Sequence, residues 1–142
     1  MRALIDYGYA LEFYGDLDRE LFNPKTGSCY VERAYPDVNF VIDLIHISGG
    51  AAVMAHPAQY DSIELLEELA EKGKIDGVEI NHYSADEAYR SELRKIAEKF
   101  NLICTGGSDF HGLYNSVPTH LGSETTDYEN LERILKLTSK KK

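Results

Sequence analysis

Residues 102–111 read Leu-Ile-Cys-Thr-Gly-Gly-Ser-Asp-Phe-His, an apolar run that gives way to glycines and then to polar side chains. A short apolar run without helical spacing is typical of a parallel strand that is buried on both faces. Two further runs, Ala-Ala-Val-Met-Ala at 51–55 and Gly-Val-Glu-Ile at 77–80, stop shortly before His56 and His82. The sequence therefore predicts three buried strands, each followed by side chains that can bind a ligand.

Segments with a helical spacing of apolar residues alternate with these runs. They cover 38–48, 61–73, 84–100 and 128–137. Asp61 and Ser84 are the expected N-caps of the second and third helices. Helices and strands that alternate at this spacing predict an α/β fold of parallel β/α units joined by short loops. The expected core residues are Val53, Leu65, Leu66, Leu69, Val78, Ile80, Ile96 and Ile103.

The first 37 residues differ from the rest of the chain in composition and pattern. They are rich in tyrosine, glycine and aspartate, and their apolar residues show no clear helical or strand period. Short helices are expected at 3–5, 9–14 and 17–22. We therefore divide the chain into a helical and irregular lead-in segment, 1–37, and a region of β/α units, 38–142.

Composition and charge argue against several classes of function. A chain of 142 residues is long enough to bury a core, and its formal net charge of -9 gives no general attraction to nucleic acids or anionic membranes. No apolar run approaches the roughly 18 residues of a membrane span, and the N-terminus lacks the apolar core of a signal peptide. Its two cysteines, Cys29 and Cys104, cannot form a disulfide framework. The expected location is the cytoplasm.

Four side chains that can bind a metal follow the predicted strands: His56, His82, Asp109 and His111. The carboxyl ends of parallel strands share one edge, where ligands gather in β/α folds. Imidazole and carboxylate groups are suitable ligands for zinc, manganese and iron. Each residue alone has an ordinary alternative as a loop, surface or capping residue, but their shared position favours a common site. His46 is expected to be structural or on the surface, and the place of His120 is left open.

Three segments resemble successive blocks of the polymerase-and-histidinol-phosphatase (PHP) phosphoesterases. They are 49–57 (Gly-Gly-Ala-Ala-Val-Met-Ala-His-Pro), 76–80 (Asp-Gly-Val-Glu-Ile) and 105–112 (Thr-Gly-Gly-Ser-Asp-Phe-His-Gly). The similarity is to the branch that hydrolyses small phosphorylated molecules such as nucleoside bisphosphates, and it covers roughly residues 27–122. It implies the C-terminal part of a distorted β/α barrel, with a cluster of divalent metal ions (manganese, zinc or iron) at the strand ends.

By this resemblance the metal ligands are His56, Asp109 and His111, while Glu79 and His82 lie on the substrate side. The implied reaction is hydrolysis by a metal-activated water, because a bound metal lowers the pKa of water and neutralises phosphoryl charge. Such a reaction needs no nucleophilic side chain, and no catalytic side chain is assigned.

Members of this family begin with a His-x-His pair on the first strand, and this chain has none. One reading is a metal-dependent phosphoesterase that acts on a small phosphorylated molecule such as a nucleotide, needs a missing N-terminal half and hydrolyses poorly or not at all alone. The alternative is a catalytically inactive PHP-like binding or interaction module that holds metals weakly or not at all. A transferase or polymerase-associated domain is a third, less favoured reading. An incomplete barrel also leaves open sheet edges, which favour self-association.

Overall fold

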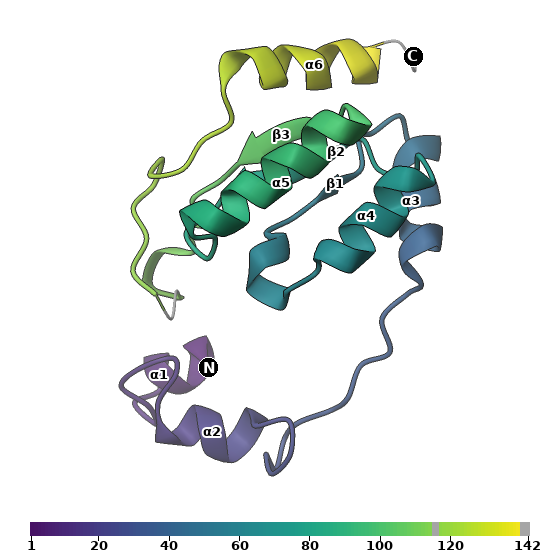
Figure 1. The fold of residues 1–142 in the computed structure, drawn as a ribbon. Helices are drawn as coiled ribbons and strands as arrows, with labels where there is room; N and C mark the ends of the chain where they lie inside the picture. Colours follow the sequence, from purple (N-terminus) through teal and green to yellow (C-terminus); the bar gives the residue numbers. More distant parts are fainter. Residues whose placement is uncertain (115–116, 140–142) are drawn as a thin grey trace. The chain divides into compact units, whose positions relative to one another are not determined.

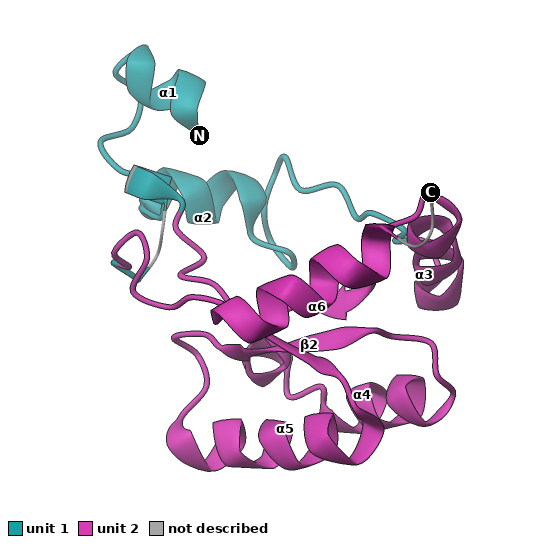
Figure 2. Cartoon of the chain, turned by 90° about the horizontal axis from the view of Figure 1, so that it is seen from above, with its two compact units in different colours: residues 1–35, 111–118 teal, residues 36–110, 119–142 magenta. Residues whose placement is uncertain are grey.

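The computed structural model describes residues 1–114 and 117–139, without the side chain of Leu113. The chain divides into two compact units, which are coloured separately in Figure 2. Unit 1 comprises residues 1–35 and 111–118, and unit 2 comprises residues 36–110 and 119–142. The predicted division at residue 37 stays a prediction, and each unit is described by itself.

Unit 2 is built on a parallel sheet of three strands in the order β1-β2-β3 (Figure 1). The strands are β1 (Val53–Met54), β2 (Gly77–Asn81) and β3 (Ile103–Gly106). Val78 pairs with Met54 on one side and with Cys104 on the other. A helix connects each strand to the next, so the predicted α/β class with parallel β/α units is confirmed. β1 is shorter than the apolar run that predicts it.

The helices of unit 2 are α3 (Val38–Ile47), α4 (Ile63–Glu71), α5 (Glu87–Phe100) and α6 (Tyr128–Ser139). In Figure 1, α4 and α5 lie side by side in front of the strands, and in Figure 2 α6 lies on the other side of β2 from α5. Two expected N-caps are wrong. Asp86 caps α5 in place of Ser84, accepting a hydrogen bond from the Tyr89 amide at 2.8 Å. Ser62 precedes α4, because Asp61 has a left-handed backbone that ends the 3-10 helix η1 (Pro57–Tyr60).

The core lies between the sheet and the helices of unit 2. Leu66 of α4, Val78 of β2 and Leu93 of α5 are each 0% exposed. The expected core residues that are buried are Leu66, Leu69, Val78, Ile80, Ile96 and Ile103. Val53 is half-buried. The expectation for Leu65 is wrong, since it is 38% exposed and lies beside the buried stripe that Leu66 and Leu69 define.

The outer edge of β3 is covered by the chain itself. The amide of Cys104 donates to Asn130 Oδ1 at 2.9 Å, and the amide of Gly106 donates to Thr126 Oγ1 at 3.0 Å. Gly107 also forms an isolated antiparallel bridge with Thr125. The expectation of an open edge is therefore wrong at β3, because Thr126, before α6, and Asn130, within it, occupy the amides that would pair with another strand. Self-association stays a prediction.

Unit 1 contains α1 (Arg2–Asp6), α2 (Asp16–Phe22) and the 3-10 helix η2 (Gly112–Tyr114). The helix expected at 9–14 does not form, and these residues make turns instead. The Phe13 and Tyr114 rings meet edge to face with centroids 4.3 Å apart, and Tyr14 Oη donates to the Tyr114 carbonyl at 2.7 Å. Contacts between distant parts of the sequence therefore override the local helical pattern.

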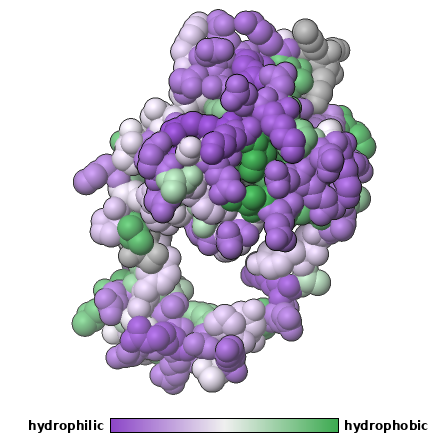
Figure 3. Space-filling model, viewed as in Figure 1, coloured by the Kyte–Doolittle hydropathy of each residue, from purple (hydrophilic) through white to green (hydrophobic). Residues whose placement is uncertain are grey.

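Most of the surface visible in Figure 3 is hydrophilic, with a small hydrophobic patch near the middle of the view. Among the residues that the structure describes, no helix has both the length and the apolar character needed to cross a membrane. The cytoplasmic location stays a prediction.

Candidate functional site at the strand ends

Four of the five predicted site residues lie together in unit 2, where the strands end. The rings of His56 and His82 have centroids 5.1 Å apart, and His82 Nε2 is 3.6 Å from Asp109 Oδ2. The carboxylate of Glu79 accepts a hydrogen bond from the His56 amide at 2.8 Å. His111 belongs to unit 1, and its place beside these residues stays a prediction.

His56 occupies a strained turn between β1 and η1. Its φ and ψ are 28° and 59°, a positive-φ conformation that L residues rarely adopt. The bond to Glu79 and the buried side chain of Pro57 hold the turn in place. The ring nitrogen Nδ1 of His56 is buried and has no hydrogen-bond partner. A buried polar atom of this kind is costly unless a ligand completes its bonding, so His56 is available to bind a cation.

His82 is held in one orientation by Ser84. The His82 side chain is 1% exposed, and its Nδ1 lies 2.7 Å from Ser84 Oγ. The Ser84 amide also donates to Nδ1, at 3.3 Å. The other ring nitrogen, Nε2, is buried without a hydrogen-bond partner. Ser84 therefore orients an imidazole rather than capping a helix.

Asp109 is the second predicted ligand with a positive φ, at 46°. Aspartate and asparagine adopt this region more readily than most L residues, and Asp61 and Asn101 also have positive φ in this chain. The two glycines before the Ser-Asp pair allow close packing of the strands. A Cβ on Gly106 would lie 2.6 Å from Asn81 Cβ, and a Cβ on Gly107 would lie 3.0 Å from Glu79 Oε1. Glycine at both positions therefore lets the end of β3 approach the end of β2.

Tyr89 and Arg90, near the start of α5, hold the loops that carry the two histidines. Tyr89 Oη donates to the carbonyl of Pro57 at 3.3 Å, next to His56. Arg90 donates to the carbonyl of His82 at 2.9 Å. Sequence reasoning missed both residues, because a helical pattern does not show which polar side chains reach a neighbouring loop. Their positions soon after a strand-end histidine are the one signal that the sequence offers.

The surroundings of Tyr89 and Arg90 keep both side chains in the charge states that let them donate hydrogen bonds to the histidine loops. Burial raises the pKa of Tyr89, and the charge of Asp61 adds to the rise, so the hydroxyl stays protonated and can donate at neutral pH. Arg90 contacts Glu124 through two nitrogens, at 2.7 and 3.4 Å. The two side chains are only 19% and 23% exposed, so solvent screens this ion pair weakly.

These residues offer part of a metal-binding set. Among the described residues, no group of three or more His, Cys, Asp or Glu side chains is arranged to hold a metal ion by itself. His56 nevertheless contributes a buried, unpartnered nitrogen, and the Asp109 carboxylate adjoins the neighbouring His82. Imidazole and carboxylate donors fit a divalent cation, so the available chemistry suits the implied metal. His120, left open by the sequence, is exposed.

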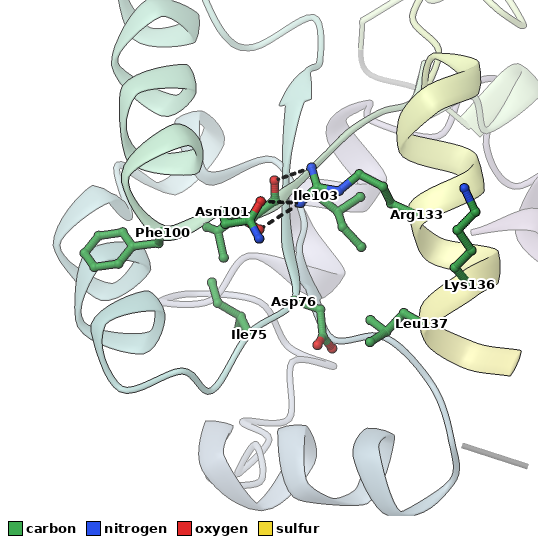
Figure 4. A pocket seen from close by; sticks show the side chains of 9 residues that line it. Ile75, Asp76, Phe100, Asn101, Ile103, Arg133, Lys136 and Leu137 are labelled. Carbon is green, nitrogen blue, oxygen red and sulfur yellow. Dashed lines mark hydrogen bonds between the residues drawn. The ribbon is translucent and has the colours of Figure 1, made fainter. Parts of the chain in front are cut away.

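The amino-terminal end of the strands has different contacts. His46 Nε2 is 2.9 Å from Asp76 Oδ2, so His46 makes a structural contact, as expected. A hollow of about 460 Å³ lies at this end and is shown in Figure 4. Within it, Arg133 donates to the Asn101 carbonyl at 2.8 Å and to Asn101 Oδ1 at 3.0 Å. These polar groups satisfy one another, so the hollow is a weaker candidate than the opposite end.

The sequence and the fold of this chain are similar to those of several known proteins. No family model matches the chain. The phosphoribosyl 1,2-cyclic phosphate 1,2-diphosphodiesterase of Eggerthella lenta is 38% identical over 122 residues, which are 86% of this chain and 45% of that protein. The 5'-3' exoribonuclease Rnm of Escherichia coli is 32% identical over 114 residues, or 78% of this chain and 38% of that protein. A Bifidobacterium adolescentis crystal structure, provisionally classed as a metal-dependent phosphoesterase, gives a TM-score of 0.77 at 30% identity, covering 96% of this chain and 48% of that one.

The names of these proteins describe a diphosphodiesterase, an exoribonuclease and a metal-dependent phosphoesterase, and this chain is similar to part of each of them. The resemblance to PHP phosphoesterases that the three sequence blocks predict is confirmed, as is the partial PHP-type α/β fold. The chain spans about half the length of the relatives it matches, or less.

Proposed function

We propose that this chain carries part of the active site of a metal-dependent phosphoesterase that hydrolyses a small phosphorylated molecule such as a nucleotide. The observation that carries the proposal is the buried, unpartnered nitrogen Nδ1 of His56, whose ring lies 5.1 Å from that of His82, which adjoins the carboxylate of Asp109. His56 and Asp109 are the proposed metal ligands, and His111 is the third. Glu79 and His82 are predicted on the substrate side of the same cluster.

The chemistry divides between the cation and the chain. With a divalent metal bound (manganese, zinc or iron), the site would gain an activated water near neutral pH and a charge that offsets the phosphoryl oxygens. The chain's own residues hold the His56 loop in place. The Glu79 carboxylate accepts a hydrogen bond from the His56 amide, and the Tyr89 hydroxyl donates to the Pro57 carbonyl. The positive φ of His56 is compatible with such a role, because ligand binding can offset a backbone conformation that is unfavourable alone.

The relatives narrow the substrate only to a class. Their names refer to a cyclic phosphate diester of phosphoribose and to RNA, and both substrates contain phosphoester bonds. We infer a phosphoester substrate for the whole protein of which this chain represents a part. Hydrolysis by these 142 residues alone is expected to be poor or absent, because catalytic metal sites use about three protein ligands for one ion.

A second function, a catalytically inactive PHP-like binding module, is favoured by one observation. No described cluster of three ligands is complete, so the chain could retain the fold and a weak cation site without turnover. The phosphoesterase proposal predicts a cation at Asp109 and hydrolysis by the complete site, whereas the inactive module holds metals weakly or not at all and does not hydrolyse phosphoesters.

The test combines metal analysis with an activity assay. The purified chain is dialysed against Mn²⁺, its metal content is measured by elemental mass spectrometry, and hydrolysis of bis(p-nitrophenyl) phosphate is followed. We expect bound Mn²⁺ that is lost in Asp109→Ala and kept in Asp43→Ala, a matched change of an exposed carboxylate on α3. Absence of bound metal in the unmodified chain contradicts the proposed site. Rapid turnover that Asp109→Ala abolishes contradicts the inactive module and the expectation of an incomplete site.

A further inference from the structure

We propose that His82 is a positioning residue that holds the carboxylate of Asp109 through its Nε2–H, rather than a residue that touches substrate. The inference rests on the proposed function, since Asp109 is there a metal ligand. It assigns His82 a role that the motif alone does not indicate.

The tautomer of His82 follows from Ser84. A backbone amide can only donate, and the Ser84 amide points to Nδ1 of His82 at 3.3 Å. Nδ1 is therefore an acceptor, and it can also accept from Ser84 Oγ at 2.7 Å. A neutral imidazole that accepts at Nδ1 carries its hydrogen at Nε2. The ring therefore presents an N–H on the side away from Ser84.

The Nε2–H has one carboxylate close by. Asp109 Oδ2 is 3.6 Å from Nε2, slightly beyond hydrogen-bond distance, and Nε2 has no other partner. A small movement of the Asp109 loop would complete the bond, and hydrogen bonds in metal and catalytic sites often tighten when the ligand arrives. A carboxylate that accepts a hydrogen bond from a fixed donor is held in one orientation, which is how outer-sphere partners tune metal sites.

Burial argues against direct contact between His82 and a substrate. At 1% exposure, the ring has almost no surface for a substrate to reach. Its backbone is also fixed, because Arg90 donates to the His82 carbonyl at 2.9 Å and to the Ala85 carbonyl at 3.0 Å. The anchoring Arg90 is in turn paired with Glu124. A side chain fixed in this way suits the orientation of a neighbour better than movement with a substrate.

The first test reads the tautomer in the metal-free chain. Long-range ¹H–¹⁵N NMR of the histidine rings distinguishes a protonated Nε2 from a protonated Nδ1. We expect His82 to carry its hydrogen at Nε2, and we expect that ¹⁵N resonance to shift in Asp109→Asn, while the resonances of His46 stay unchanged. A hydrogen at Nδ1 of His82, or no response to Asp109→Asn, overturns the inference. This reading needs no metal, so it stands apart from failure of the proposed function, which would appear as absent Mn²⁺ binding.

The second test measures Mn²⁺ affinity by titration. His82→Leu removes the donor, and we expect the dissociation constant to rise about 10- to 100-fold, the range seen when outer-sphere partners of metal ligands are lost. His82→Gln keeps an N–H near the position of Nε2, and it should restore most of the affinity. Adding His82→Leu to Asp109→Ala should cause no further loss, because the two residues act in series. If His82→Gln loses Mn²⁺ as completely as Asp109→Ala, His82 is itself a ligand and the positioning role is wrong. Circular dichroism of each variant checks that it is folded.

Discussion

Two histidine–aspartate pairs lie at opposite ends of the same three strands, and their imidazole rings differ in hydrogen bonding. At the amino-terminal end, His46 Nε2 and Asp76 Oδ2 are 2.9 Å apart, and the same Asp76 oxygen accepts from the Ala52 amide at 2.7 Å. At the carboxyl end, His82 Nε2 and Asp109 Oδ2 are 3.6 Å apart, and Nε2 has no hydrogen-bond partner.

The backbone differs as well as the side chains. Asp109 has a φ of 46°, whereas Asp76 is not among the described residues with positive φ. One end of the sheet thus uses its imidazole and carboxylate to hold the chain together. At the other end, the buried His56 Nδ1 and His82 Nε2 have no hydrogen-bond partner, which is typical of a site that needs a ligand. Residue type alone therefore does not distinguish structure from function here, but the bonding of each group does.

The substitution Asp109→Gly should weaken Mn²⁺ binding at the carboxyl end without lowering the stability of the fold. Glycine adopts a positive φ without strain, so the free energy of unfolding should stay within about 1 kcal/mol of the unmodified chain. Mn²⁺ affinity should fall at least about tenfold, because a proposed ligand is gone. Urea unfolding and Mn²⁺ titration measure the two effects. A large loss of stability with metal binding intact would reverse the roles assigned to the two ends.

Asp76→Ala is the reciprocal change and should affect stability instead. It removes the acceptor of two hydrogen bonds and leaves the Ala52 amide and the His46 ring without it, so we expect a loss of about 3 kcal/mol in the free energy of unfolding. Mn²⁺ affinity of the folded fraction should be unchanged. Asp76→Asn, which keeps an acceptor oxygen, serves as the matched control and should lose less. An Asp76→Ala chain of normal stability would mean that the hydrogen bonds of Asp76 do not stabilise the fold.

The sequence anticipates much of this comparison, and for a physical reason. Strand and helix patterns depend on local periodicity, and the carboxyl ends of parallel strands must share an edge, so His56 and Asp109 could be placed near His82 from the order of elements alone. The role of Asp76 could not, because its partners in α3 and before β1 come from contacts with distant residues.

The predictions that the structure contradicts also depend on contacts between residues that are distant in the sequence. The helix expected at 9–14 gives way to contacts with Tyr114, which is remote in sequence. The edge of β3 is closed by Thr126 and Asn130, which come after the last predicted strand and have no strand pattern. Where distant segments supply the partner, local spacing carries no information about it.

A smaller effect is expected from Tyr89→Phe at the carboxyl end. The change removes the hydrogen bond to the Pro57 carbonyl and keeps the ring, so the free energy of unfolding should fall by about 1 kcal/mol. The backbone after His56 should become less fixed, and a modest weakening of Mn²⁺ binding should accompany the loss. Tyr83→Phe, a change at an exposed tyrosine, is the control. Equal effects from the two substitutions would show that the α5 hydroxyl does not support the site.

The smallest effect should come from Cys104, which lies on β3 between the two ends. Burial raises the pKa of its thiol, and the opposing charge of Arg133 is the smaller influence. A raised folded-state pKa favours the neutral thiol, so its stabilising contribution is present below the unfolded value of about 8.5 and is lost as pH rises above it. Stability should therefore fall more steeply above that pH in the unmodified chain than in Cys104→Ala. Iodoacetamide should label the exposed Cys29 well before Cys104 in the native protein, and urea should remove the difference. If Cys104 reacts as fast as Cys29 without urea, β3 is open between the two ends, and the contrast between a bonded end and an open one does not hold.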